Sequence, residues 1–125
     1  DATRHRTLCE LQLSEWIGKG RLLASQVAIL SPWRQPRSSL ADVSSLRGMA
    51  LTNDLDTWRT GKAVLVDTIK RFKGLEADAL LLIDVPTPES VPSFKLSDLY
   101  VACSRAKHLL SVLTTSDHVR ELVAE

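Results

Sequence analysis

The chain has 125 residues, of which 44% are hydrophobic and 25% are charged, and this composition excludes disordered, collagen-like and membrane-spanning proteins. Its 16 Lys and Arg residues nearly balance its 15 Asp and Glu residues, so only a local cluster of cations could argue for nucleic-acid binding. The length suits one domain with one hydrophobic core, and we expect residues 1–125 to form a single domain.

The first half of the chain predicts a helix, a strand and a second helix. Apolar residues recur at helical spacing over residues 7–19, which predicts an amphipathic helix that ends at the glycines after it. The apolar run 27–30 is short and continuous, as expected of a strand that is covered on both faces. Apolar residues at three-residue intervals over positions 40–46 predict a second helix, which ends near Gly48.

The middle of the chain predicts two further strands. Residues 52–62 are polar and read as irregular, or as a weak strand followed by a loop. The runs 63–66 and 79–85 are continuous and apolar, which predicts two buried strands. Three prolines between residues 86 and 93 then exclude regular structure there.

The end of the chain predicts a helix, a strand and a last helix. Ser97 and Asp98 can cap a helix that runs through residues 99–107. The apolar residues among 108–115 predict a strand, and Ser116 is positioned to begin the last helix.

Alternating helices and strands with continuous apolar runs predict an α/β fold: a three-layer sandwich with a mostly parallel sheet and helices on both faces. Such sheets bind ligands at the carboxyl ends of their strands. We therefore expect the polar side chains that follow the strand 63–66 to lie together at that edge of the sheet. These side chains are Thr68, Lys70, Arg71, Lys73 and Glu76.

The segment TIKRFKGLE at residues 68–76 is the clearest candidate for a binding site. Lys70 and Lys73 could neutralise the phosphates of a nucleic-acid strand, and Gly74 would let a ligand approach the backbone closely. Glu76 can only accept hydrogen bonds when ionised, which suits a sugar hydroxyl. From composition alone the alternative is a solvated basic loop, because short basic runs are common.

Two arginine-containing segments are further candidates. In LYVACSRAK (residues 99–107) the apolar side chains share one helical stripe, which leaves Arg105 on another face, where it could reach a transferring phosphoryl group. The alternative for Arg105 is a surface arginine near a helix end. Arg34 and Arg37 follow the strand 27–30 and could contact phosphates, although two arginines in a loop are weak evidence alone.

Other kinds of site find no support in the sequence. The three histidines do not have metal-ligand spacing, and Cys9 and Cys103 lack the spacing of a zinc or redox site, so we expect no metal site and a reducing compartment. Neither an export signal nor a membrane-spanning run is recognisable, and we expect a cytoplasmic protein, nucleoid-associated if bacterial, without a membrane partner. The chain starts at Asp1, and we expect it to be a piece of a longer protein.

Together these segments resemble the C-terminal RecA-like motor domain of superfamily 1 helicases of the UvrD and Rep type. Motif V of that family reads T-x-H-x-x-K-G-L-E ahead of an apolar strand, and residues 68–76 here read TIKRFKGLE. Motif VI reads approximately L-Y-V-A-x-[ST]-R-A-[RK], and residues 99–107 read LYVACSRAK. The order of the two motifs agrees with the family, and VAILSPWR (residues 27–34) resembles the strand and loop that open this lobe.

The resemblance implies an ATP site that is shared with an N-terminal RecA-like lobe of the same full-length chain. Arg105 matches the motif VI arginine that contacts the γ-phosphate, and it is the catalytic residue that we expect. Glu76 matches the motif V glutamate near the ribose, and Gly74 precedes it in the same motif. We expect these three residues to bind ATP.

The resemblance also implies a surface for single-stranded nucleic acid, and the family favours DNA. Thr68 and Lys73 match motif V positions that face the strand, and Lys70 stands where the family usually has histidine. We add Arg34 and Arg37 to this surface because of their place after the first strand.

The implied function is the C-terminal motor lobe of an ATP-dependent DNA helicase or translocase, with ATP and Mg²⁺ as cofactors. Few residues separate the run 27–30 from the run 63–66, so the large accessory insertion of UvrD-like enzymes is missing. The phosphate-binding loop GxxxxGK[ST] and the acidic metal-binding motif are missing too, and we expect this chain not to hydrolyse ATP alone. The alternatives are a nucleic-acid-binding module without a motor and a protein-interaction domain on a RecA-like fold.

Overall fold

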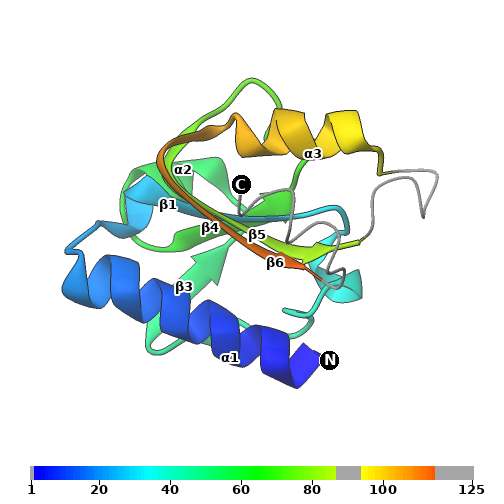
Figure 1. Ribbon diagram of the computed structural model, residues 1–125. Coiled ribbons are helices and arrows are strands. Elements are labelled where there is room, and N and C mark those ends of the chain that lie inside the picture. Colours follow the sequence, from blue (N-terminus) through cyan, green and yellow to red (C-terminus); the bar gives the residue numbers. More distant parts are fainter. Residues whose placement is uncertain (1, 87–93, 115–125) are drawn as a thin grey trace.

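A computed structural model describes residues 2–86 and 94–114, which form a six-stranded sheet with helices on both faces (Figure 1). The strand order is β2-β3-β4-β1-β5-β6, and every neighbouring pair is parallel except β2 and β3. The strands are β1 (Val27–Ser31), β2 (Ser45–Leu46), β3 (Met49–Thr52), β4 (Val64–Thr68), β5 (Ala77–Val85) and β6 (Ala106–Thr114). The predicted mostly parallel α/β fold is confirmed.

Helices of different lengths cover the two faces of the sheet. The helix α1 (Ala2–Leu13) continues as a π-helical segment (Ser14–Lys19) and lies below the sheet in Figure 1, whereas α3 (Leu96–Cys103) lies above it. The remaining helical elements are α2 (Leu55–Arg59) and the 3₁₀ turns Ala24–Gln26 and Gln35–Arg37. In the ranges 2–86 and 94–114, no helix has both the length and the apolar character needed to cross a membrane.

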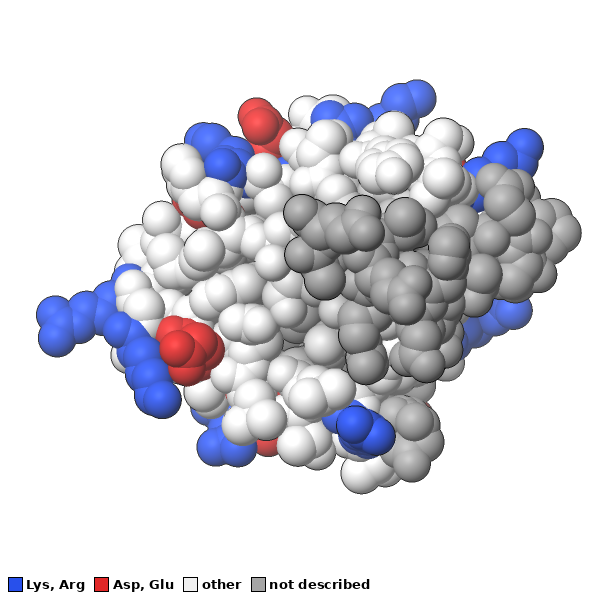
Figure 2. Space-filling model, in the orientation of Figure 1, with Lys and Arg blue, Asp and Glu red and all other residues white. Residues whose placement is uncertain are grey.

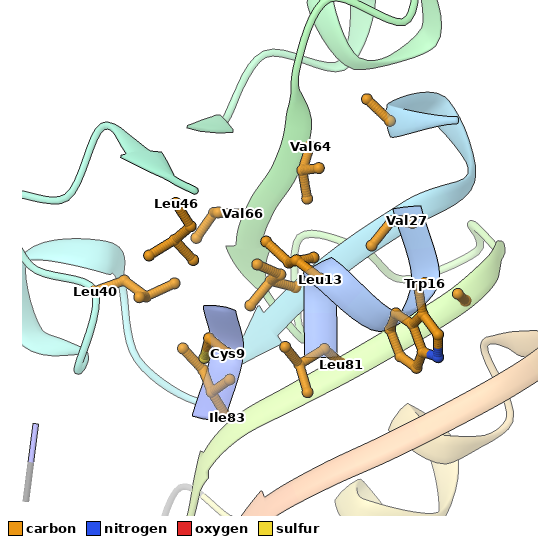
Figure 3. Packing of buried hydrophobic residues seen from close by; sticks show 13 residues of the cluster. Cys9, Leu13, Trp16, Val27, Leu40, Leu46, Val64, Val66, Leu81 and Ile83 are labelled. Carbon is orange, nitrogen blue, oxygen red and sulfur yellow. The ribbon is translucent and has the colours of Figure 1, made fainter. Parts of the chain in front are cut away.

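The central strands are buried on both faces, which is why their sequences read as uninterrupted apolar runs. Along β1, Val27 and Ile29 join a core cluster on the α1 face, and Ala28 and Leu30 join a second cluster on the other face. Figure 3 shows Cys9, Leu13 and Trp16 of the first helical region packed against the sheet. The predicted helix 7–19 is therefore confirmed, although α1 begins earlier.

The predicted helix over residues 40–48 is wrong. This region forms turns and the antiparallel hairpin β2–β3. Arg47 and Gly48 occupy its two-residue turn, and both have positive φ (51° and 79°), as a type I′ turn requires. Leu40 and Leu46 still reach the α1-face core, but from a turn and a strand rather than from a helix.

The segment 52–62 contains the short helix α2, which the sequence analysis did not predict. Asp54 is its N-cap, because the carboxylate Oδ2 accepts hydrogen bonds from the backbone N–H (3.0 Å) and hydroxyl (2.7 Å) of Thr57. The hydroxyl bond and then the backbone bond lower the pKa of Asp54. Trp58 of α2 is buried, and its Nε1–H donates to the carbonyls of Ala24 and Val27 (3.0 and 2.9 Å).

The C-terminal part contains the predicted helix and strand with different boundaries, and α3 begins at Leu96 with Lys95 rather than Ser97 or Asp98 as its N-cap. The strand β6 is present as predicted but begins at Ala106, so Ala106 and Lys107 are strand residues and the predicted helix ends early, at Cys103. Asp98 takes part in capping α3, because its Oδ2 accepts from the N–H of Lys95 (2.8 Å). The predicted last helix from Ser116 lies outside the described residues, as do residues 87–93.

Candidate nucleotide and nucleic-acid sites

The segment 69–76 crosses from one edge of the sheet to the other. It starts at the carboxyl edge, where Thr68 pairs with Ser31 and the N–H of Ile69 donates to the Ser31 carbonyl (3.0 Å). It ends at the amino edge, where Ala77 begins β5 beside the start of β6. The expectation that residues 68–76 all lie at the carboxyl edge is therefore wrong. A connection between two strands that run in the same direction has to return to the opposite edge.

Phe72 attaches this crossover segment to the core. It is fully buried, and its ring lies 5.9 Å from that of Trp58, centroid to centroid, at an interplanar angle of 59°. Within the segment the N–H of Phe72 donates to the carbonyl of Thr68 (3.2 Å), and the N–H of Leu75 donates to that of Phe72 (3.0 Å). The side chains of Lys70, Lys73 and Glu76, by contrast, are exposed.

Gly74 supplies a left-handed backbone conformation to the crossover segment. Its φ is +84°, which residues with a Cβ rarely adopt. Apart from Gly74 itself and its two chain neighbours, no atom of the described residues lies within 4 Å of the position of a Cβ there. Backbone conformation, rather than lack of space, therefore explains the glycine within this chain.

Arg105 lies at the amino edge, in the turn between α3 and β6. This location corrects the predicted one, since the helix has already ended and Tyr100 of the expected apolar stripe is 58% exposed. The carbonyl of Arg105 accepts a hydrogen bond from the N–H of Ala77 (3.0 Å), which is the residue after Glu76. Two of the predicted ATP-binding residues, Glu76 and Arg105, therefore lie at the same edge.

The side chains of Glu76 and Arg105 are available to a ligand. Neither side chain has a hydrogen bond or ion pair with the residues that the structure describes. An ionised carboxylate can accept bonds from ribose hydroxyls, and a guanidinium can donate to phosphate oxygens. Over residues 2–86 and 94–114, no group of three or more His, Cys, Asp and Glu residues could hold a metal ion.

A groove of about 750 Å³ lies at the carboxyl edge. The loop after β1 leaves toward the α1 face, where Leu40 is buried, and the segment after β4 leaves toward the other face, where Phe72 is buried. Open α/β sheets bind ligands where the connections after two neighbouring strands leave toward opposite faces of the sheet. Its charged and hydroxyl-bearing lining residues are Arg34, Asp42, Ser44, Thr52, Asp67, Thr68 and Arg71.

The groove contains part of the predicted nucleic-acid surface. Arg34 and Thr68 line it, whereas Arg37, Lys70 and Lys73 do not. Among the described residues, Lys and Arg side chains are spread around the outline of the face shown in Figure 2 rather than gathered in one patch. On that face the described cations therefore form no broad basic surface.

Residues 63–113 match the sequence model of the UvrD-like helicase C-terminal domain family. This segment belongs to that family. A comparison with curated proteins finds no match to the chain. The resemblance seen in the sequence is confirmed over the matched residues, and the six-stranded, mostly parallel sheet agrees with the RecA-like fold that the family implies.

The UvrD-like segment runs from β4 through the crossover segment and α3 into β6, and it therefore includes Thr68, Glu76 and Arg105. Arg34 and Arg37 lie outside it, so their assignment depends on their place in the fold. The sequence analysis missed Asp42 and Asp67, two carboxylates that line the groove. Asp67 follows the predicted strand 63–66 directly, and its position at a strand end was the available signal.

Proposed function

We propose that this chain is the C-terminal motor lobe of an ATP-dependent superfamily 1 DNA helicase or translocase. Arg105 and Glu76 serve an ATP site that is completed by an N-terminal RecA-like lobe. Arg34, Arg37, Thr68, Lys70 and Lys73 hold single-stranded DNA. The crossover segment carries the proposal, because one short UvrD-like segment joins the groove at the carboxyl edge to Glu76 at the amino edge.

The chemistry at the amino edge is electrostatic. With ATP and Mg²⁺ bound by the first lobe, the nucleotide supplies a γ-phosphoryl group whose transfer develops negative charge on its oxygens. Arg105, which has no partner among the described side chains, donates to those oxygens when the two lobes close. Glu76 accepts a hydrogen bond from the ribose and orients the nucleotide.

Closure at the amino edge reaches the groove through the crossover segment. Phe72 is fixed between Trp58 and the sheet, so residues 69–76 move with the core rather than as a free loop. Thr68 and the lysines at positions 70 and 73 then shift with Glu76 when the lobe moves. Each cycle of closing and reopening would advance the grip on the strand.

The test uses the full-length protein that contains both lobes. Arg105→Ala should lower the kcat of strand-stimulated ATP hydrolysis by about 10³-fold or more, because arginine fingers contribute on this scale. Single-stranded DNA binding should remain close to that of the wild type. Arg59→Ala is the matched control, since Arg59 is an exposed arginine at the end of α2. Undiminished ATP hydrolysis by Arg105→Ala would overturn the assignment.

The rival function, a nucleic-acid-binding module without a motor, makes a different prediction. It requires strong, salt-sensitive strand binding by this chain alone, whereas half of a motor should bind weakly. On the face shown in Figure 2, the described cations do not form the continuous basic surface that a stand-alone module would need.

A further inference from the structure

A set of buried and half-buried polar side chains connects three distant parts of the chain. Its members are His5 and Arg6 of α1, Ser39 of the loop after β1, and Asp84 near the end of β5. We call these four residues the loop clamp. His5 and Ser39 are 7% and 9% exposed, and the side chain of Asp84 is 11% exposed. Buried polar side chains are usually held by hydrogen bonds, so the partners of these residues show what they do.

Asp84 holds Ser39 by two hydrogen bonds. Its Oδ2 accepts from the N–H of Ser39 (2.8 Å), and its Oδ1 accepts from the Ser39 hydroxyl. The N–H of Asp84 in turn donates to His5 Nε2 (3.2 Å), which fixes the carboxylate relative to α1. The carboxylate therefore ties the loop to β5 and to the first helix.

Arg6 holds the same loop from the other side. Its Nε donates to the Ser39 carbonyl (2.6 Å), and its guanidinium also donates to the Ala41 carbonyl (3.1 Å). Within the loop, Gln35 donates to the carbonyls of Leu40 (3.0 Å) and Val43 (2.8 Å). The backbone between Ser39 and Val43 is thus fixed by side chains and not by regular secondary structure.

The backbone of Asp84 is unusual for a residue with a Cβ. Its φ is +55°, in the left-handed region, and the pairing of β5 with β6 shifts register between Leu82 and Val85. Glycine would adopt this conformation with less strain. A carboxylate here costs free energy in the backbone but gains two bonds to Ser39, which indicates that the side chain has a task at this position.

The role of the Asp84 side chain concerns the groove at the carboxyl edge. The loop that the clamp holds carries Arg34 and Asp42, both of which line the groove, whereas Asp84 itself does not. Asp84 can therefore act on a ligand only through the loop. We propose that Asp84 is a positioning residue that keeps the loop after β1 in place, so that Arg34 is held ready for a strand phosphate. This inference rests on the proposed function, which gives Arg34 its nucleic-acid role.

The experiment measures binding of a fluorescently labelled oligothymidylate to the full-length protein over a range of salt concentrations. Asp84→Gly keeps the backbone conformation accessible and removes both bonds to Ser39. We expect it to weaken binding several-fold and to reduce the slope of log K against log salt by about 0.7, the effect of losing one phosphate contact to a single strand. Arg34→Ala should give the same loss, and the double variant no more than either alone.

Three further variants separate positioning from stability. Asp84→Asn tolerates the left-handed φ and keeps an acceptor for Ser39, so it should restore much of the binding. Arg6→Ala removes the bonds to Ser39 and Ala41 and should reproduce the Asp84→Gly defect, which keeps the test decisive if Asp84→Gly does not fold. Ile83→Val trims the neighbouring buried residue of β5 and should leave the salt slope unchanged.

The outcomes are distinct. If Arg34→Ala does reduce the slope, an unchanged salt slope in folded Asp84→Gly overturns the inference, as does an unchanged slope in Arg6→Ala where Asp84→Gly does not fold. Additive losses in the Asp84→Gly/Arg34→Ala double variant also overturn it, because a positioning residue can act only through the arginine. If Arg34→Ala has no effect, the nucleic-acid role of Arg34 is wrong and the inference fails with it, while the ATP-site assignment of Arg105 is untouched.

Discussion

Replacing Phe72 by alanine tests whether the crossover segment is attached to the core. Phe72 is fully buried, and of residues 69–76, all of which the structure describes, it is the one with a buried side chain. Truncation of a core phenylalanine removes the transfer free energy of the ring and leaves a cavity, which together cost about 3–5 kcal/mol. We expect Phe72→Ala to lower the free energy of unfolding by that amount.

Tyr100→Ala is the matched control. Tyr100 is an aromatic residue of similar size, but it is 58% exposed on α3, and its truncation should change the free energy of unfolding by about 0.5 kcal/mol or less. Urea denaturation followed by circular dichroism measures both variants. Equal losses in Phe72→Ala and Tyr100→Ala would show that Phe72 does not attach the segment.

A double-mutant cycle with Trp58 locates the attachment. The tilted ring contact of Trp58 and Phe72, with centroids 5.9 Å apart, should give a coupling of about 0.5–1.5 kcal/mol beyond the burial of each ring. Trp58→Leu is the partner substitution because it removes the ring and keeps an apolar side chain, although it also loses the donor to Ala24 and Val27. That loss is present with or without Phe72 and so cancels in the cycle. A coupling of zero would place the attachment elsewhere in the core.

The strands of the sheet centre were predictable because their environment is uniform. β1, β4 and β5 have helices or loops on both faces, so nearly every position is apolar and a continuous run identifies each strand. The apolar stripe of α1 and its π-helical continuation was visible for the same kind of reason, because Cys9, Leu13 and Trp16 all face one core cluster. Local sequence was sufficient to predict an element wherever each of its faces lies in a single environment, either the core or solvent.

The region after β1 was not predictable from local spacing. Leu40 and Leu46 are buried, and their spacing fits a helix, but side chains more than thirty residues away in the sequence hold this loop. Arg6 donates to two of its carbonyls, and Asp84 accepts from Ser39, so tertiary bonds override the periodic pattern. The short helix α2 was not predicted for a different reason, because Leu55–Arg59 is too short to show a helical periodicity of apolar residues.

The location of the candidate site residues on the sheet was predicted incorrectly. Residues 68–76 were assigned to the carboxyl edge because they follow β4, yet β4 and β5 are both parallel to β1. The predicted parallel sheet already required this connection to cross to the amino edge. Applied to residues 68–76, that requirement would have placed Glu76 near the start of β5. The contact of Ala77 with Arg105 was invisible in the sequence, since it depends on where α3 ends.

Two predictions concern single residues and are measured by urea denaturation of this chain. Burial raises the pKa of the Cys9 thiol from about 9 to about 12, and the carboxylates of Asp84 and Glu10 add to the rise. Above pH 9 the unfolded thiol therefore loses its proton while the folded one keeps it, and the free energy of unfolding should fall by about 1.4 kcal/mol per pH unit more steeply than in Cys9→Ala. Parallel pH profiles would contradict this. Gly74→Ala should cost about 1–2 kcal/mol, because a φ of +84° brings a Cβ close to the carbonyl oxygen that follows it even where neighbouring space is open. Gly18→Ala, a helical position with equally open space and no positive φ, should instead be neutral or stabilising by up to about 1 kcal/mol. Because both substitutions add the same methyl group to open space, only the backbone conformation distinguishes them, and equal effects would refute the conformational explanation of Gly74.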